Sequence, residues 1–427
     1  MFTRLLSTII ITCCLASPAF AESLTLEQAI GLALQNNPQL KAVQAKLGVS
    51  EAEIKTAAAR PNPNFISNGG VAQDTYQIGI EQTFELGSKR KRRISFARAE
   101  QALVKSKISE ALLNLRADVR QTYTRLYIYQ ERQKAYKEIL HNTETLLNIT
   151  QKRELAGDIA KLDVLQADIT VVKAKNDLQT LKSQLVSAQN QLNTLLNKPL
   201  KTTLTLTTPS TFPQIISAVS SPEPDMRESG ALKAKAQKTN FTLDRLIEIA
   251  LDNRPEIKQN ENAQEAARQK LALAKANRTP NLSLSSGADI VLPGGNENQY
   301  NVFFEASIGI PVFNRQQGPI QKALAEQAQL QQAQSALKNK IILEVTNAYN
   351  AFFVHQDRVM RYETELLPKV QQILEKSHRS FEEGKSSILI PLGAQQAYID
   401  TRLGYLEAEM DMQDAIGDLE RAVGEAL

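Results

Sequence analysis

The chain has 427 residues, and its 50 lysines and arginines nearly balance its 46 aspartates and glutamates. This balance gives no reason to expect nucleic acid as a partner, which would favour a strongly basic surface. After the first 21 residues, no run approaches the roughly 18 apolar residues that a membrane-spanning helix needs. If the mature protein enters a membrane, we therefore expect it to do so with β-strands.

The first 21 residues, 1–21, have the pattern of a secretory signal peptide. A short positive start and an apolar run precede Ala-Phe-Ala at 19–21, which fits the small-x-small cleavage rule. Cys13 and Cys14 leave a lipoprotein signal open as an alternative, although neither of them follows a small Gly, Ala or Ser. With cleavage after residue 21 no cysteine remains, which excludes disulfides and thiolate ligands, so stability must come from packing and oligomerisation.

The rest of the chain is a duplication. The segment TLEQAIGLALQNNPQLK from Thr25 recurs as TLDRLIEIALDNRPEIK from Thr242, and farther on Tyr123 recurs as Tyr349. A period near half the chain is too long for a solenoid unit, so we predict two copies of one large unit. The expected division is a signal peptide (1–21), a first repeat (22–197), a linker or equatorial segment (198–240) and a second repeat (241–427).

Each repeat is expected to contain short helices, two strands and a long helical hairpin. Alternation of apolar and polar residues marks the strands, and three-four spacing without proline marks the helices. The predicted elements are helices at 25–37 and 38–60, strands at 65–71 and 76–84, and a helix at 88–155 with its return partner. The second copy follows with helices from Thr242 and Pro255, strands at 282–291 and 300–310, and helices at 319–382 and from Pro391 onward.

The return helix of the first hairpin is expected to form the seam of an antiparallel coiled coil. Its predicted seam residues are Leu162, Leu165, Ile169, Val172, Leu178, Leu181, Leu185, Leu192 and Leu195. The strands are about as long as the 9 to 11 residues that a tilted membrane strand requires. Four strands cannot close a barrel alone, so we expect several copies of the chain to share their strands.

These features together resemble the TolC-type outer-membrane efflux proteins, through TLEQAIGLALQNNPQL near the mature start and RELAGDIAKLDVLQAD at a hairpin tip. The segments EQTFELGSKRKRRI (81–94) and GIPVFNRQQGPIQKA (309–323) resemble the heavy-metal cation branch of that family. The resemblance implies a mainly α-helical protein with membrane β-strands, located in the outer membrane and extending into the periplasm. It also implies a homotrimer whose chains give four strands each to a twelve-stranded barrel above an α-helical tunnel. The implied partners are a periplasmic adaptor, an inner-membrane resistance-nodulation-division pump and outer-membrane lipid.

The hairpin tips are the first candidate site. The resemblance places adaptor docking there, on Arg153, Gly157, Asp158, Gly384 and Lys385. The alternative is that the two glycines only cap the helices.

Two acids form a second candidate site. Glu81 and Glu305 sit in corresponding places on the second strand of each pair, opposite the apolar face. Because a lipid-facing charge is costly, we expect both carboxylates to line the lumen, where rings of acids concentrate cations. The alternative is that they only keep the lumen wet.

A run of five cations, Lys89, Arg90, Lys91, Arg92 and Arg93, opens the first long helix. Cations in a first turn oppose the helix dipole, so they need compensation. Contact with lipid phosphates at the periplasmic face of the membrane and a solvated collar both remain open.

No catalytic, cofactor or metal site is expected. His141, His355 and His378 do not occupy equivalent positions in the two repeats, and no phosphate loop or nucleophile motif occurs. This absence predicts a passive channel, and the family resemblance implies the exit duct of a tripartite system that exports heavy-metal cations and is opened by the adaptor. The alternatives are a general multidrug or protein-secretion tunnel and, from another class, a secreted coiled-coil structural or adaptor protein.

Overall fold

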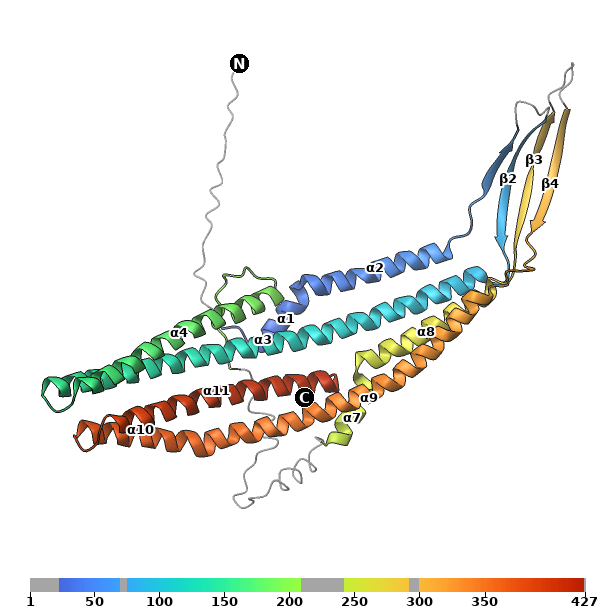
Figure 1. Cartoon of the computed structure of the whole chain (residues 1–427). Coiled ribbons are helices and arrows are strands. Elements are labelled where there is room, and N and C mark those ends of the chain that lie inside the picture. Colours follow the sequence, from blue (N-terminus) through green and yellow to red (C-terminus); the bar gives the residue numbers. More distant parts are fainter. Residues whose placement is uncertain (1–22, 70–74, 209–241, 292–298, 426–427) are drawn as a thin grey trace, which may run out of the picture.

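The computed structural model describes residues 23–69, 75–208, 242–291 and 299–425. It is a long helical rod with a four-stranded sheet at one end and two helical tips at the other (Figure 1). The first repeat contains α1 (Leu26–Asn36), α2 (Pro38–Ala58), β1 (Asn64–Asn68), β2 (Thr75–Glu85), α3 (Lys89–Leu155) and α4 (Lys161–Leu195). The second contains α7 (Leu243–Asn253), α8 (Pro255–Ala276), β3 (Asn281–Val291), β4 (Gln299–Ile308), α9 (Gln317–Arg361), the π-helical turn η1 (Tyr362–Leu366), α10 (Leu367–Glu382) and α11 (Leu389–Val423).

The two halves therefore follow the same order of elements, as the duplicated sequence predicts. The predicted signal peptide, most of the linker (209–240) and the strand links at 70–74 and 292–298 lie outside the described part of the chain. Among the described residues, no helix is both long and apolar enough to cross a membrane.

The short helices begin where the sequence supplies capping groups. Thr25 and Gln28 form a reciprocal capping box, since each side chain accepts a hydrogen bond from the other's backbone N–H. Asn37 ends α1 and caps α2, where its Oδ1 accepts from the Leu40 N–H at 3.0 Å. Pro38 at the first position of α2 leaves no N–H to satisfy there.

The four strands form one antiparallel sheet in the order β1-β2-β3-β4. Side chains paired directly across neighbouring strands share a face. One face is almost entirely apolar and carries Phe65, Ile78, Ile80, Phe84, Leu282, Leu284, Val302, Phe304 and Ile308. Phe65 is 75% exposed and Phe304 is 82% exposed, so this face is uncovered within a single chain.

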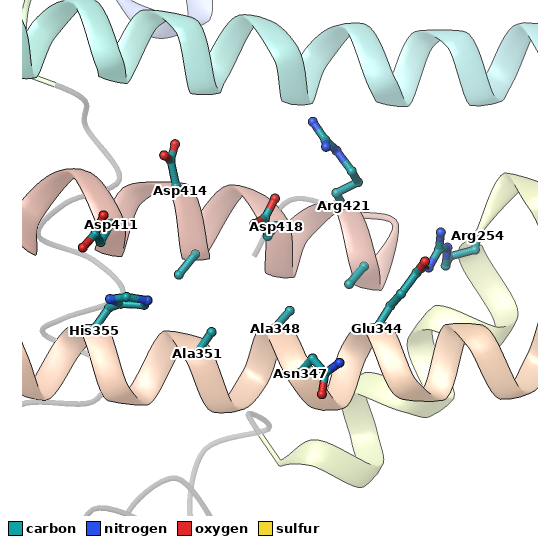
Figure 2. Close-up of a pocket in the computed structure, with 12 residues that line it drawn as sticks. Arg254, Glu344, Asn347, Ala348, Ala351, His355, Asp411, Asp414, Asp418 and Arg421 are labelled. Carbon is teal, nitrogen blue, oxygen red and sulfur yellow. Dashed lines mark hydrogen bonds and ion pairs between the residues drawn. The ribbon is translucent and has the colours of Figure 1, made fainter.

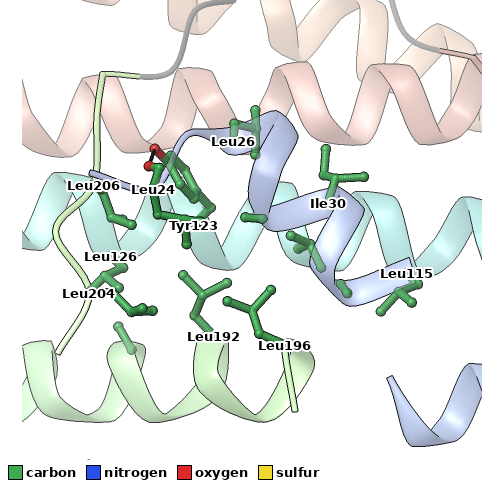
Figure 3. Close-up of a cluster of buried hydrophobic side chains, with 14 of the residues drawn as sticks. Leu24, Leu26, Ile30, Leu115, Tyr123, Leu126, Leu192, Leu196, Leu204 and Leu206 are labelled. Carbon is green, nitrogen blue, oxygen red and sulfur yellow. Dashed lines mark hydrogen bonds between the residues drawn. The ribbon is translucent and has the colours of Figure 1, made fainter. Parts of the chain in front are cut away.

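Each repeat has its own hydrophobic core. The first joins α1, α3 and α4 around Tyr123, which is fully buried (Figure 3). The Tyr123 hydroxyl lies 2.7 Å from the carbonyl oxygens of Leu24 and Thr207, so one phenol ties together the segments before α1 and after α4. The second core joins α7, α9 and α11 around Phe352.

The contact between the two repeats is charged where α3 meets α11. Arg120 pairs with Glu420 at 2.9 Å, and both side chains are 11% exposed. Arg421 of α11 reaches Asp118 of α3 at 3.1 Å. The two halves thus have apolar interiors and a salt-bridged interface between them.

The predicted seam of the first hairpin is wrong in the first half of α4. Leu162, Leu165, Ile169 and Val172 are 51% to 68% exposed, and the buried residues are Ala167, Val171, Ala174, Leu181, Ala188 and Leu192. Counting back in heptads from Leu181 leads to Ala174 and Ala167, which are small enough for close packing against α3. The large aliphatic residues therefore lie on the outer face, although side chains of this size would be expected to pack against the partner helix.

The second long helix also differs from the prediction. It begins at Gln317, and its α-helical hydrogen bonding is interrupted by η1 just before Pro368. Tyr362 of this π turn packs on α11 at Gly404, where an added Cβ would lie 2.5 Å from the Tyr362 hydroxyl. The proline is accommodated because it falls in the first turn of α10, where the N–H needs no partner in its own helix.

Candidate functional sites

The two helical tips contact each other at the end of the rod remote from the sheet. Leu146, Ala167, Phe381 and Ile388 form a small buried cluster that contains residues of both hairpins. Gly157 has φ +81° and Gly384 has φ +71°, so both adopt the left-handed conformation that ends a helix. The glycines therefore cap the helices. Capping by the glycines is compatible with docking of a partner on the exposed tip.

Arg153 joins the tips directly. Its guanidinium donates a 2.8 Å hydrogen bond to the Phe381 carbonyl and lies 4.7 Å over the Phe381 ring. Its nearest acid is Asp158, at 3.9 Å. Of the predicted tip residues, the structure brings Arg153 close to Gly384, while Lys385 pairs with Glu383 at 2.5 Å. Phe381 was not among the predicted site residues. The only sequence feature that marks it is that it is the one aromatic residue within the charged segment RSFEEG (379–384).

The second candidate site lies on the polar face of the sheet. Glu81 on β2 and Glu305 on β4 are both paired with Ser285 of β3, so the three side chains form one row across the sheet. Ser285 is buried between them. The two acids thus share the polar face, as their alternation predicts.

Two further acids share that face. Asp289 lies in the row of Gln77 and Asn301, and Glu85 lies at the helical end of β2. None of the described strand residues is a lysine or an arginine. The sequence analysis did not single out Asp289, although the alternation of β3 places it on this face in the same way as Glu81 and Glu305. The polar wall is therefore acidic over its whole described length.

One aromatic residue interrupts the polar face. Phe303 lies across Gly79 and Gly287, where added Cβ atoms would lie 3.1 Å and 2.7 Å from its ring. The Gly287 Cβ would also lie 2.1 Å from the Ile78 carbonyl oxygen, so this position admits no side chain. Glycine is required here by the close approach of neighbouring backbone.

The basic collar at the start of α3 divides into two groups. Arg90 donates to the Ala58 carbonyl at 2.6 Å, and Arg93 donates to the Ala57 and Ala59 carbonyls at 3.2 Å and 3.0 Å. These carbonyls close α2, where the negative end of a helix dipole favours cations. The compensation that the start of α3 requires is therefore supplied partly by the end of α2.

Two more contacts hold this junction between strands and helices. Arg93 forms a two-point ion pair with Glu85, and Lys89 is buried and bonded to the Asn281 side chain. Burial lowers the pKa of Lys89, and the nearby Glu85 carboxylate opposes this change. Lys91 and Arg92 remain exposed and make no hydrogen bond or ion pair within the described ranges. Of the five cations, these two are therefore the ones left free for either expected role, contact with lipid phosphates or a solvated collar.

A cavity of about 540 Å³ lies between α9 and α11 (Figure 2). It is lined by His355 and several charged groups, and three of its four acids, Glu344, Asp411 and Asp414, face cationic partners. Asp411 pairs with Arg358 at 2.8 Å, and Asp414 faces Arg125 at 3.7 Å. Burial raises the pKa of Asp414, and Arg125 opposes this effect. No group of three potential metal ligands occurs in the part of the chain that the structure describes.

Comparison with known proteins identifies the family. The model of the family described as "Outer membrane efflux protein" matches residues 29–198 and 246–425, one segment in each repeat. The chain belongs to this family. It is an outer-membrane efflux channel that extends into the periplasm, and it is not an enzyme. The alternative of a secreted coiled-coil protein is therefore wrong.

Two curated relatives have different cargoes in their names. The chain is 23% identical over 407 residues to the cobalt-zinc-cadmium resistance protein CzcC of Cupriavidus metallidurans, covering 95% of this chain and 91% of that protein. It is 24% identical over 397 residues to the pyoverdine export outer membrane protein OpmQ of Pseudomonas aeruginosa, covering 89% and 77%.

Solved structures confirm the TolC-type channel fold. The chain superposes on CusC with a TM-score of 0.74 at 21% identity, covering 95% of this chain and 93% of that chain. The outer-membrane channel OprN gives 0.74 at 20% identity, with 94% and 90% covered. The MtrE channel of Neisseria gonorrhoeae gives 0.69 at 18% identity, with 94% and 89% covered.

Proposed function

We propose that the channel is a homotrimer that serves as the exit duct of a tripartite efflux system for heavy-metal cations. The sheet has two edge strands, β1 and β4, that pair with no further strand among the described residues. An open edge in lipid leaves backbone groups without hydrogen bonds, at a cost of several kcal/mol each. Three copies joined edge to edge close one barrel of twelve strands and remove every edge.

The outer face of α4 supports sharing between copies. Leu162, Leu165, Ile169 and Val172 form an exposed apolar stripe there. If this stripe contacts a different surface of the next copy, the contact is head-to-tail. Head-to-tail contacts close into a ring when the rotation from one copy to the next divides a full turn evenly. A folded, membrane-inserted monomer in mild detergent would contradict this assembly.

The acidic wall of the sheet is the observation that carries the cation assignment. Glu81, Asp289 and Glu305 share one face with Glu85, whose charge Arg93 balances, and no described strand residue offers a positive charge. Such a wall raises the local concentration of cations and repels anions. The similarity to a cobalt-zinc-cadmium resistance protein over nearly the whole chain points in the same direction. The channel itself acts as a passive conduit, and an inner-membrane resistance-nodulation-division pump supplies the energy.

The tips provide the docking site for a periplasmic adaptor. Gly157 has nothing within 4 Å of an added Cβ, so its surface is open to a partner. Asp158 follows it and Lys385 lies on the other tip, and both are exposed and charged. Replacing Gly157 and Asp158 together should abolish efflux and leave the trimer yield unchanged.

Because Gly157 has a positive φ, a side chain there also strains the cap. Asp158→Asn with Lys385→Gln is the matched variant, since it changes only charge. Loss of efflux in both variants, with intact trimers, supports docking. Lost assembly in the first variant and normal efflux in the second would favour simple capping.

The cargo is tested by deleting the protein and measuring growth on metal salts. We expect sensitivity to one or more of the cobalt, zinc, cadmium, copper and silver salts, restored by the intact chain. Unchanged metal tolerance after deletion would contradict the proposal.

Export of an organic compound is the second candidate, because the pyoverdine export protein is similarly related. The same deletion strain distinguishes the two. Retention of a siderophore or drug, with normal metal tolerance, would identify an organic cargo.

A further inference from the structure

The two repeats differ where a strand leads into a long helix. In the first repeat only residues 86–88 separate β2 from α3, whereas in the second repeat residues 309–316 separate β4 from α9. Both long helices nevertheless start after a residue in the left-handed conformation, Ser88 at φ 60° and Gln316 at φ 62°. The additional residues of the second link are therefore not needed to start the helix.

The longer link is held by its own hydrogen bonds. The Gln317 side chain donates to the Phe313 carbonyl at 3.0 Å and accepts from the Arg315 N–H at 2.8 Å. The Gln316 N–H donates to Asn314 Oδ1 at 3.0 Å. The backbone shape of the link thus requires no contact from the Phe313 ring.

The apolar side chains of the link point away from the protein. Phe313 is 92% exposed, the highest value among the large apolar side chains of the described residues, and Ile310 is 79% exposed. Ile310 continues the apolar face of β4 below Ile308. The link that carries Phe313 therefore begins at the end of the apolar face of the sheet.

Exposed cations occur at the same end of the rod as this ring, where both α3 and α9 begin (Figure 1). Arg315 follows it in the link, and Lys91 and Arg92 lie in the first turn of α3. Arg278 follows α8, next to Thr279, which touches Gly87 at the start of α3. None of these four side chains pairs with an acid within the described ranges. An aromatic residue among unpaired cations is the composition that binds an anionic membrane interface.

We infer that residues 310–315, with Lys91, Arg92 and Arg278, anchor the channel in the periplasmic leaflet of the outer membrane. Phe313 and Ile310 enter the region between headgroups and acyl chains, and the cations bind phospholipid phosphates. The inference depends on the outer-membrane location and not on the identity of the cargo. Its failure would leave the efflux proposal intact.

The sequence contains no tryptophan, so Phe313→Trp gives each chain one tryptophan, at the same position in every copy, as a fluorescent reporter. The full chain is reconstituted in vesicles of equal parts phosphatidylcholine and phosphatidylglycerol, with a nitroxide placed either shallow or deep on an acyl chain. We expect blue-shifted emission that the shallow label quenches severalfold more than the deep one, since interfacial groups enter about 5–10 Å. The control is Val354→Trp on α9, which is 66% exposed and should show neither effect.

Two outcomes of this experiment overturn the inference. Emission like that of Val354→Trp would place the ring in water. Blue-shifted emission without lipid quenching would place it against a neighbouring copy of the chain.

The cations are tested in the Phe313→Trp background. Nitroxide-labelled phosphatidylglycerol should quench severalfold more than labelled phosphatidylcholine at low salt, and this preference should shrink as salt rises. Lys91→Gln, Arg92→Gln and Arg315→Gln together should remove the preference. A control triple variant, Lys182→Gln, Lys338→Gln and Lys376→Gln, should keep it. Equal quenching by the two lipids in the starting channel would overturn phosphate binding.

Discussion

The guanidinium of Arg153 donates a hydrogen bond to the Phe381 carbonyl and covers the Phe381 ring, although the two residues are 228 positions apart. It thereby joins the tip of the first hairpin to that of the second. Phe381 is fully buried, so the contact combines a charge-assisted hydrogen bond with a desolvated aromatic face. This cross-link lies at the end of the rod remote from the sheet (Figure 1).

Arg153→Met is expected to loosen the tips. Removing a charged hydrogen bond of this kind costs about 1.5 to 3 kcal/mol, so the tips should open at least about tenfold more often. Amide hydrogen exchange of residues 379–388 measures this directly. Lys152→Met removes an exposed cation of the same turn and serves as the control. Equal exchange rates in the two variants would show that Arg153 does not hold the tips.

Glu81→Gln with Glu305→Gln is expected to lower the cation preference of the pore. The row across Ser285 makes both acids part of one wall, and their effect should be largest at low salt. Screening lengths fall from about 30 Å at 0.01 M to about 3 Å at 1 M, so the difference should vanish at high salt. Planar-bilayer reversal potentials measure it. Unchanged selectivity at low salt, equal to that of an exposed α2 control such as Glu51→Gln, would leave only a wetting role.

Gly287→Ala is expected to destabilise the sheet. The added Cβ meets the Ile78 carbonyl and the Phe303 ring, and overpacking of this kind typically costs about 1 to 3 kcal/mol. Gly309→Ala is the matched control, because nothing lies within 4 Å of its Cβ position. Heat-modifiable gel migration should show an earlier transition for the first variant alone. The same transition in both would contradict the close approach.

Glu409→Gln is expected to stabilise the helical region at neutral pH. Burial raises the pKa of Glu409, and nearby Glu363 and Glu131 add to this, while a hydrogen bond from Tyr405 and the charge of Arg402 oppose it. The folded chain therefore binds a proton more tightly than the unfolded chain does. The free energy of unfolding therefore falls as pH rises from the pKa of Glu409 in the unfolded chain to its higher pKa in the folded chain. Above the folded-state pKa the loss of stability is complete and no longer changes with pH.

The glutamine keeps an acceptor for Tyr405 and removes this pH dependence. Thermal unfolding measured from acidic to neutral pH should show a flatter profile than that of the parent. Glu407→Gln, an exposed neighbour on α11, should leave the profile unchanged. A parent-like slope in Glu409→Gln would show that another group titrates.

Most of the fold follows from local signals. Thr25, Asn37 and Pro38 start helices by short-range hydrogen bonding, and alternation in β2 and β4 places apolar and polar faces correctly. The seam of α4 could not be derived this way, because alanines such as Ala167 become knobs only when the partner helix is close. Side-chain size on one helix does not reveal that distance.

The sequence predicted where the residues of the candidate sites lie better than it predicted which groups they contact. Glu81 and Glu305 share a face because strand periodicity is local. The partners of Arg90 and Arg93 are carbonyls of α2, and no sequence pattern marks a carbonyl that is free to accept. The contact of Arg153 with Phe381 depends on how two hairpins meet across the whole chain. The docking, lumen and lipid-binding roles of these residues stay predictions.

The π turn at Tyr362–Leu366 has a consequence for the history of the chain. Before it, Tyr123 corresponds to Tyr349, 226 positions later, whereas after it the tip glycine Gly157 corresponds to Gly384, 227 positions later. The π turn accommodates one more residue than an α turn, so it absorbs a single-residue insertion without breaking the helix. The two arms of the duplication thus differ by one residue between these positions. Deleting one residue of this turn should restore an uninterrupted α-helix and separate Tyr362 from Gly404.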